Sequence, residues 1–127
     1  MPLRALVADD DPDLLEVVVS VVSRLGLAVT YASSGGELLD KLAEQGPFDV
    51  VVTDVSMPWI TGLQVLHSAR VAGLACPVIV MTGLSDTKTR QQVAALGEGV
   101  IMLHKPFSVS TLAAALGTLL HGAVTAA

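Results

Sequence analysis

Short apolar runs alternate along this chain with longer segments in which apolar residues recur every three or four positions. The runs are rich in valine, which is typical of strands that are buried on both faces. The spacing between them is long enough for an amphipathic helix to follow each run. The pattern therefore predicts strands at residues 3–8, 28–32, 49–53, 78–82 and 100–104.

Residues that begin and end helices lie where the pattern predicts them. Asp11 is a plausible N-cap, with Pro12 at the first helical position and Gly26 closing the first helix. Three consecutive valines in this helix favour a strand by themselves, but cap, length and closing glycine agree on a helix. The other predicted helices run from a cap at Ser33 or Ser34 to about Gly46, over residues 62–71 and 86–96, and onward from a cap at Ser108 or Ser110.

Strands and helices that alternate in this way build a parallel sheet, because right-handed crossovers place helices on both of its faces. The 127 residues fit one domain and leave no room for a second catalytic or DNA-binding module. We therefore expect an α/β fold: a single-domain, doubly wound, five-stranded parallel sheet with five helices.

Composition excludes several classes of protein. With 52% hydrophobic and 15% charged residues, the chain is not expected to be disordered. A net charge of −5 is the opposite of what phosphate contacts require, so direct binding of nucleic acid is not expected. The final stretch, residues 111–127, is too short and too weakly hydrophobic for membrane insertion.

The cysteine content points to a reducing compartment. Cys76 is the single cysteine, so the chain cannot form an internal disulfide. No signal-peptide pattern opens the sequence. We therefore expect a cytoplasmic location.

Polar residues that could bind a ligand or react follow the predicted strands. Asp9 and Asp10 end the first strand, Asp54 ends the third, Thr82 ends the fourth, and Lys105 follows the fifth. Because the carboxyl ends of parallel strands share one edge of the sheet, these side chains are expected to meet there.

Such a set of side chains suits phosphoryl transfer. Three carboxylates in one crevice repel each other unless a cation compensates, and hard oxygen ligands suit Mg²⁺. A carboxylate nucleophile, a metal, a lysine and a hydroxyl are the equipment of phosphoryl transfer. Each residue alone has a more ordinary explanation, since acids at strand ends often cap helices. Their order and spacing together carry the prediction.

The sequence resembles the receiver domain of two-component response regulators and hybrid histidine kinases. The resemblance extends from about Leu3 to Leu120 and implies the flavodoxin-like strand order 2-1-3-4-5, a core of about residues 3–121 and a tail at 122–127. It rests on Leu-Val-Ala-Asp-Asp-Asp-Pro at 6–12, Val-Val-Thr-Asp-Val-Ser-Met-Pro at 51–58 with Gly62, Val-Met-Thr-Gly at 80–83, and Lys-Pro-Phe at 105–107.

The resemblance implies a phosphoacceptor and a metal site. Asp54 corresponds to the phosphorylated residue. Asp10 would bind Mg²⁺ (or Mn²⁺) directly, and Asp9 would do so directly or through water. Asp54 itself and the backbone carbonyl of Ser56 would complete the protein ligands.

Other positions and partners follow from the same resemblance. Thr82 would contact the phosphoryl group, Lys105 would neutralise it, and Gly83 would leave room for the donor. The implied donor is a phosphohistidine on a histidine kinase or a histidine phosphotransfer domain. The resemblance further implies self-catalysed aspartyl phosphorylation and slow autodephosphorylation rather than conventional enzyme turnover, and it allows a receiver homodimer.

One position departs from the family pattern. Receivers usually carry Phe or Tyr three residues before the lysine that follows the fifth strand, and this chain has Met102 there. In the family that aromatic side chain swings inward on phosphorylation. The resemblance therefore covers the residues of the phosphorylation site more fully than the residue whose movement signals phosphorylation.

Two rival interpretations remain at this stage. Residues 9–11 contain the D-x-D of aspartate-nucleophile phosphatases of the haloacid-dehalogenase type, but Pro12-Asp13 follows where such enzymes lead toward Thr or Val, and the later acid pair is missing. The other rival is a receiver-like interaction module that works without phosphorylation, against which the complete set of site residues argues.

Overall fold

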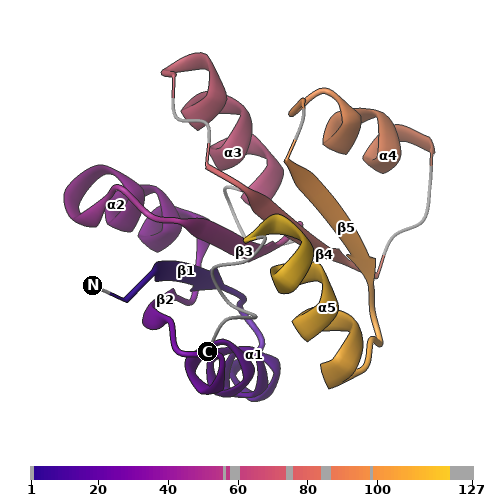
Figure 1. The fold of residues 1–127 in the computed structure, drawn as a ribbon. Helices are drawn as coiled ribbons and strands as arrows, with labels where there is room; N and C mark the ends of the chain where they lie inside the picture. Colours follow the sequence, from indigo (N-terminus) through magenta and orange to yellow (C-terminus); the bar gives the residue numbers. More distant parts are fainter. Residues whose placement is uncertain are drawn as a thin grey trace.

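The computed structural model describes residues 2–55, 57, 61–73, 76–83, 87–97 and 99–120, and these form one sheet with helices on both faces (Figure 1). All neighbouring strands are parallel, in the order β2-β1-β3-β4-β5, so the expected fold and strand order are confirmed. The strands are β1 (Arg4–Ala8), β2 (Ala28–Ala32), β3 (Val50–Asp54), β4 (Val78–Thr82) and β5 (Val100–His104).

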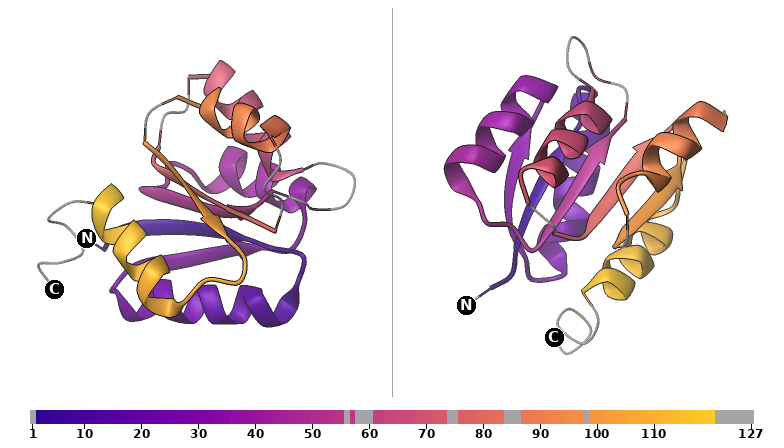
Figure 2. Two further views of the ribbon diagram at one scale, coloured as in Figure 1. Left: turned by 90° about the vertical axis from the view of Figure 1, so that its right-hand side faces the viewer. Right: turned by 90° about the horizontal axis from the view of Figure 1, so that it is seen from above.

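The helices divide between the two faces of the sheet. In Figures 1 and 2, α1 and α5 lie on one face, whereas α2, α3 and α4 lie on the other. Each helix follows a strand, as right-handed crossover connections require. The helices are α1 (Pro12–Arg24), α2 (Gly35–Gln45), α3 (Gly62–Val71), α4 (Thr87–Ala94) and α5 (Val109–Leu119).

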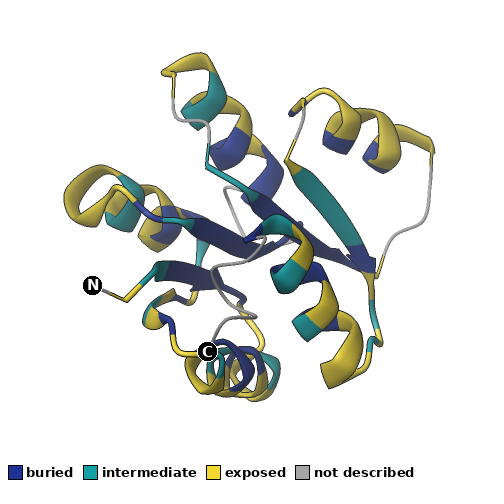
Figure 3. Cartoon of the chain, in the orientation of Figure 1, coloured by how far each residue is buried: buried dark blue, intermediate teal, exposed yellow. Residues whose placement is uncertain are grey.

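Two apolar layers sandwich the sheet. One layer packs β-strand side chains such as Val52 against α1 and α5, and the other packs side chains such as Val51 against α2, α3 and α4. Alternate residues of a strand face opposite sides, so a strand of consecutive valines serves both layers. Figure 3 shows the buried central strands between helices whose outer faces are exposed.

The first helix begins and ends at the residues that the sequence indicates. The Asp11 side chain accepts hydrogen bonds from the Asp13 and Leu14 N–H groups, at 3.0 and 3.4 Å. Gly26 has a φ of +92°, a left-handed conformation that glycine adopts without steric cost. On the core face of α1, Leu15 is the buried leucine of the first turn, whereas Leu14 is half-buried.

The fifth strand is less buried than the central ones. Three of its residues, 100–102, are half-buried, whereas every residue of β3 and β4 is buried. The covering helix α4 is short and buries only Thr89 and Val93. It spans Thr87–Ala94 in the described part of the chain, compared with the predicted 86–96. The described residues include no helix long and apolar enough to cross a membrane.

Substitution of Ser108 tests the N-cap of α5, for which the sequence allowed Ser108 or Ser110. In the structure the Ser108 hydroxyl accepts from the Thr111 N–H at 3.1 Å. We expect Ser108→Ala to lower the free energy of unfolding by about 1 kcal/mol, because a helix N–H loses its acceptor. Ser110→Ala is the matched control and should change it by less than about 0.5 kcal/mol. Urea unfolding measures both, and equal losses would contradict the assignment.

Candidate functional site

The predicted site residues meet at the carboxyl edge of the sheet. The register pairs Ala8 of β1 with Thr53 of β3, so the next residues, Asp9 and Asp54, lie side by side. On the other flank, the Lys105 N–H donates to the Thr82 carbonyl at 2.8 Å and extends the pairing of β4 with β5. Backbone pairing thus brings together residues that are far apart in the sequence.

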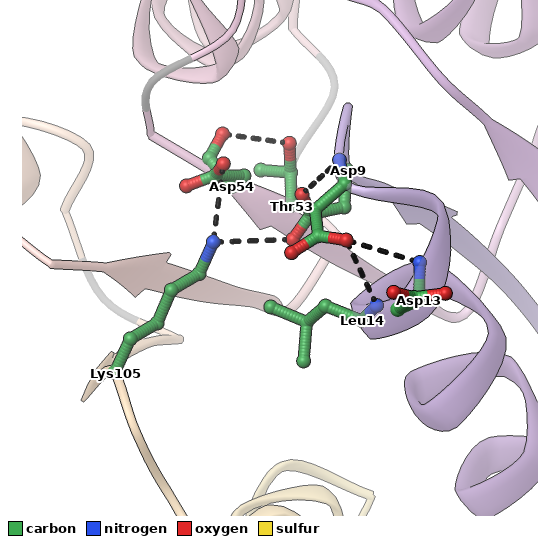
Figure 4. Close-up of polar contacts among 7 residues, drawn as sticks. Asp9, Asp13, Leu14, Thr53, Asp54 and Lys105 are labelled. Atoms are coloured by element: carbon green, nitrogen blue, oxygen red, sulfur yellow. Dashed lines mark hydrogen bonds and ion pairs between the residues drawn. The ribbon is translucent and has the colours of Figure 1, made fainter.

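Lys105 joins two of the carboxylates directly (Figure 4). Its Nζ lies 3.2 Å from Asp9 Oδ2 and 3.2 Å from Asp54 Oδ2. Both carboxylates are buried, whereas the lysine side chain is 25% exposed. Ion pairs of buried carboxylates are screened little by salt, so this arrangement holds the two acids strongly.

The turn after β1 orients the remaining acids. The other oxygen of Asp9, Oδ1, accepts from the Asp11 N–H at 2.9 Å. The Asp11 side chain caps α1 by accepting hydrogen bonds from the Asp13 and Leu14 N–H groups. Asp10, between the two, is exposed. The turn therefore directs Asp9 inward and leaves the carboxylate of Asp10 accessible.

The three acids form a group that fits a divalent cation. Each of Asp9, Asp10 and Asp54 offers a carboxylate oxygen, and these oxygens lie within 4.8 Å of one another. Three carboxylates beside the one ammonium of Lys105 leave two negative charges in excess. Oxygen ligands of this kind suit Mg²⁺ or Mn²⁺, since hard cations prefer carboxylates. The donor set therefore fits the expected metal.

Proton affinities at the site reflect burial and charge. Burial raises the pKa of Asp9, and repulsion from Asp54 raises it further, while the Asp11 N–H and Lys105 offset part of the rise. Burial lowers the pKa of Lys105, but attraction by Asp54 and Asp9 outweighs burial, so its pKa lies above the ordinary value. Lys105 is thus held as a cation between two carboxylates.

The remaining predicted residues lie on the same edge or outside the described part of the chain. Thr82 is buried at the end of β4, beside β3. Gly83 follows it and is exposed, and a Cβ there would meet nothing within 4 Å. Ser56, whose carbonyl was expected to bind the metal, lies outside the described residues.

Met102 and the lone cysteine lie away from this site. Met102 is half-buried and packs against the apolar layer beneath α2, α3 and α4. Cys76 packs against the same layer, and burial raises the pKa of its thiol. Met102 thus occupies a partly covered position on β5, the strand that leads to Lys105.

Two residues that the sequence analysis did not assign a role lie against the Asp54 backbone. The Thr53 hydroxyl donates to the Asp54 carbonyl at 3.1 Å. Gly62, the first residue of α3, comes so close that an added Cβ would clash with the Asp54 carbonyl oxygen and lie 2.8 Å from Thr53 Oγ1. Thr53 is a polar residue that follows three valines in β3, and this break in the apolar run was the available signal.

Comparisons with known proteins agree with this geometry. The response regulator receiver domain family matches residues 5–117. This chain belongs to that family. Receivers are the phosphoacceptor domains of two-component signalling, so the family fits the acids and lysine gathered at the sheet edge. Nothing in the comparisons favours a phosphatase of the haloacid-dehalogenase type.

Individual relatives of this receiver are similar over nearly its whole length. Response regulator MprA of Mycolicibacterium vanbaalenii is 39% identical over 122 residues, which cover 95% of this chain and 52% of MprA. The receiver thus spans about half the length of the curated relatives that it matches.

Solved structures share its fold. Chemotaxis response regulator CheY4 of Vibrio cholerae is 28% identical with a TM-score of 0.84, over 94% of this chain and 100% of that one. Response regulator DrrB of Thermotoga maritima is also 28% identical, with a TM-score of 0.81, over 94% of this chain and 53% of DrrB.

Substitution of Gly62 tests the close approach of α3 to Asp54. We expect Gly62→Ala to lower the free energy of unfolding by about 1–3 kcal/mol, because the new methyl group overpacks the strand end. Gly36→Ala is the control: its Cβ would meet only Ser34 Oγ at 3.9 Å, and alanine favours a helix. It should leave the receiver as stable or more stable in urea unfolding. A tolerated Gly62→Ala would contradict the described packing.

The raised pKa of Asp9 predicts a pH-dependent effect of Asp9→Asn. The pKa of Asp9 is higher in the folded protein than in the unfolded chain, where it lies near 3.8. Ionised Asp9 therefore lowers the free energy of unfolding at pH values above its folded-state pKa. This loss disappears as the pH falls toward 3.8, because Asp9 is then protonated in both states. In metal-free buffer, Asp9→Asn should therefore be more stable than the parent at about pH 7, with a gain that shrinks toward about pH 4. Urea unfolding at both pH values measures the gain, and a constant difference would contradict the direction of the shift.

Proposed function

We propose that Asp54 is the phosphoacceptor of this receiver and that Asp9, Asp10 and Asp54 hold Mg²⁺ beside it. The observation that carries the proposal is the position of Lys105, whose ammonium lies 3.2 Å from Asp54 Oδ2 and 3.2 Å from Asp9 Oδ2. Such a cation beside a reactive carboxylate suits the transfer of a dianionic group.

The reaction joins Asp54 to the phosphorus atom of the donor. A carboxylate oxygen of Asp54 attacks phosphorus, the new O–P bond forms, and the P–N bond to the donor imidazole breaks. The electron pair stays on the imidazole nitrogen, which takes up a proton. Lys105 and the hydroxyl of Thr82 are assigned to the phosphoryl oxygens, where an ammonium and an O–H donor stabilise negative charge.

The bound metal would neutralise phosphoryl charge and orient the oxygens of the reacting group. Asp10 is exposed and available to a cation, whereas Asp9 is held by Lys105 and the Asp11 N–H. We assign the backbone carbonyl of residue 56 as a further ligand from the family resemblance. We therefore assign Asp10 as the exposed metal ligand and Asp9 as a metal ligand whose position Lys105 and the Asp11 N–H fix.

The phosphodonor proposed for Asp54 is a phosphohistidine on a histidine kinase or a histidine phosphotransfer domain. Membership of the receiver family supports this, because receivers act with such partners in two-component systems. Self-catalysed phosphorylation, slow autodephosphorylation and a receiver homodimer stay predictions of the same resemblance.

Mass spectrometry after incubation with acetyl phosphate and Mg²⁺ tests the proposal. We expect the mass of one phosphoryl group to be added, and the addition to disappear in Asp54→Asn and after chelation of the metal. Asp40→Asn, an exposed carboxylate on α2, is the matched control and should be phosphorylated like the parent.

Two outcomes would overturn the assignment. Phosphorylation that survives Asp54→Asn would move the acceptor to another residue. A parent protein that binds no Mg²⁺ and accepts no phosphoryl group would favour the phosphorylation-independent interaction module instead.

A further inference from the structure

A single hydroxyl interrupts the valine strand that leads to the phosphoacceptor. Residues 50–52 are valines, Thr53 follows, and Asp54 ends β3. Thr53 is fully buried. A valine at this position would continue the pattern and pack at similar size. Burying a hydroxyl costs free energy unless the hydroxyl is hydrogen-bonded. The hydrogen-bond partner of Thr53 therefore indicates what its hydroxyl does in the structure.

That partner is the backbone of the phosphoacceptor. Thr53 Oγ1 donates to the Asp54 carbonyl at 3.1 Å (Figure 4). The register places Thr53 between Ala8 and Val80, and these two belong to the apolar layer beneath α2, α3 and α4. Thr53 therefore faces α3, whereas Asp54, the next residue, faces the other way.

The same hydroxyl lies at the entrance to α3. Gly62, the first residue of that helix, approaches so closely that a Cβ on it would lie 2.8 Å from Thr53 Oγ1 and would clash with the Asp54 carbonyl oxygen. Thr61 and Gln64 form a capping box that holds the start of the helix. Both ends of the segment from Asp54 to Gly62 thus meet around one hydroxyl.

We propose that Thr53 is a positioning residue for the metal-assisted phosphorylation of Asp54. Its hydroxyl holds the Asp54 carbonyl against the start of α3 and so fixes the backbone from which the Asp54 carboxylate projects. This inference rests on the proposed function, because it takes Asp54 as the phosphoacceptor and as a ligand of the metal. Residues that orient metal ligands without touching the metal commonly change its affinity.

Removal of the hydroxyl tests the proposal. We expect Thr53→Val to weaken Mg²⁺ binding about tenfold by isothermal titration calorimetry and to slow phosphorylation by acetyl phosphate in the same direction. Thr53→Ser keeps the hydroxyl and should restore Mg²⁺ affinity to within about twofold of the parent. Thr89→Val, which removes a buried threonine hydroxyl from α4, is the matched control and should bind Mg²⁺ like the parent.

Stability measurements separate positioning from a structural role. Urea unfolding without metal gives the cost of each substitution to the fold, and a purely structural Thr53 would lower that stability while leaving the Mg²⁺ affinity unchanged. That result would overturn the inference. Should Thr53→Val not fold, the pair Thr53→Ser and Thr53→Ala, which differ by the hydroxyl, carries the same comparison, and equal Mg²⁺ affinities would again overturn it.

Measurements on the parent protein separate a failure of the proposed function from a failure of the role inferred for Thr53. If the parent binds no Mg²⁺ and is not phosphorylated, the proposed function fails and the inference fails with it. If the parent does both and Thr53→Val matches it in Mg²⁺ affinity and phosphorylation rate, the proposed function stands and the role of Thr53 alone is overturned.

Discussion

The site depends on one ammonium group shared between two buried carboxylates. Lys105 and Asp9 are separated by 96 positions in the chain, yet Nζ and Oδ2 are 3.2 Å apart. Burying Asp9 and Asp54 side by side costs free energy through desolvation and repulsion. The lysine offsets part of that cost, and the negative charge that remains makes the edge of the sheet attractive to a divalent cation.

The parallel sheet makes this convergence possible. Because every strand runs the same way, their carboxyl ends share one edge, and loops from that edge can place acids, hydroxyl and lysine together. Valine strands buried between two apolar layers form a rigid support, and functional groups held on strand ends are positioned more accurately than groups on long loops. The thin cover of β5 by α4 leaves the strand before Lys105 the least buried of the four strands whose ends form the site.

Local signals in the sequence were enough for most elements. The cap at Asp11 and the left-handed Gly26 define α1 through interactions within a few residues, which is why they could be predicted. One local assignment, the N-cap of α5, stayed open between two residues. Ser108 and Ser110 are the same residue type, and the hydrogen bond from the Thr111 N–H to the Ser108 hydroxyl identifies Ser108 as the N-cap of α5.

By itself the sequence determined the order of elements, the alternation of apolar and polar positions, and which acids, threonine and lysine end the strands. These are properties of short segments, so propensity and periodicity report them. The tertiary structure alone decided that Lys105 bridges Asp9 and Asp54, that Asp10 stays exposed, and that Thr53 and Gly62 close around the Asp54 backbone. Those facts are distances between segments far apart in the chain, and such distances exist only once the sheet has paired and its helices have packed.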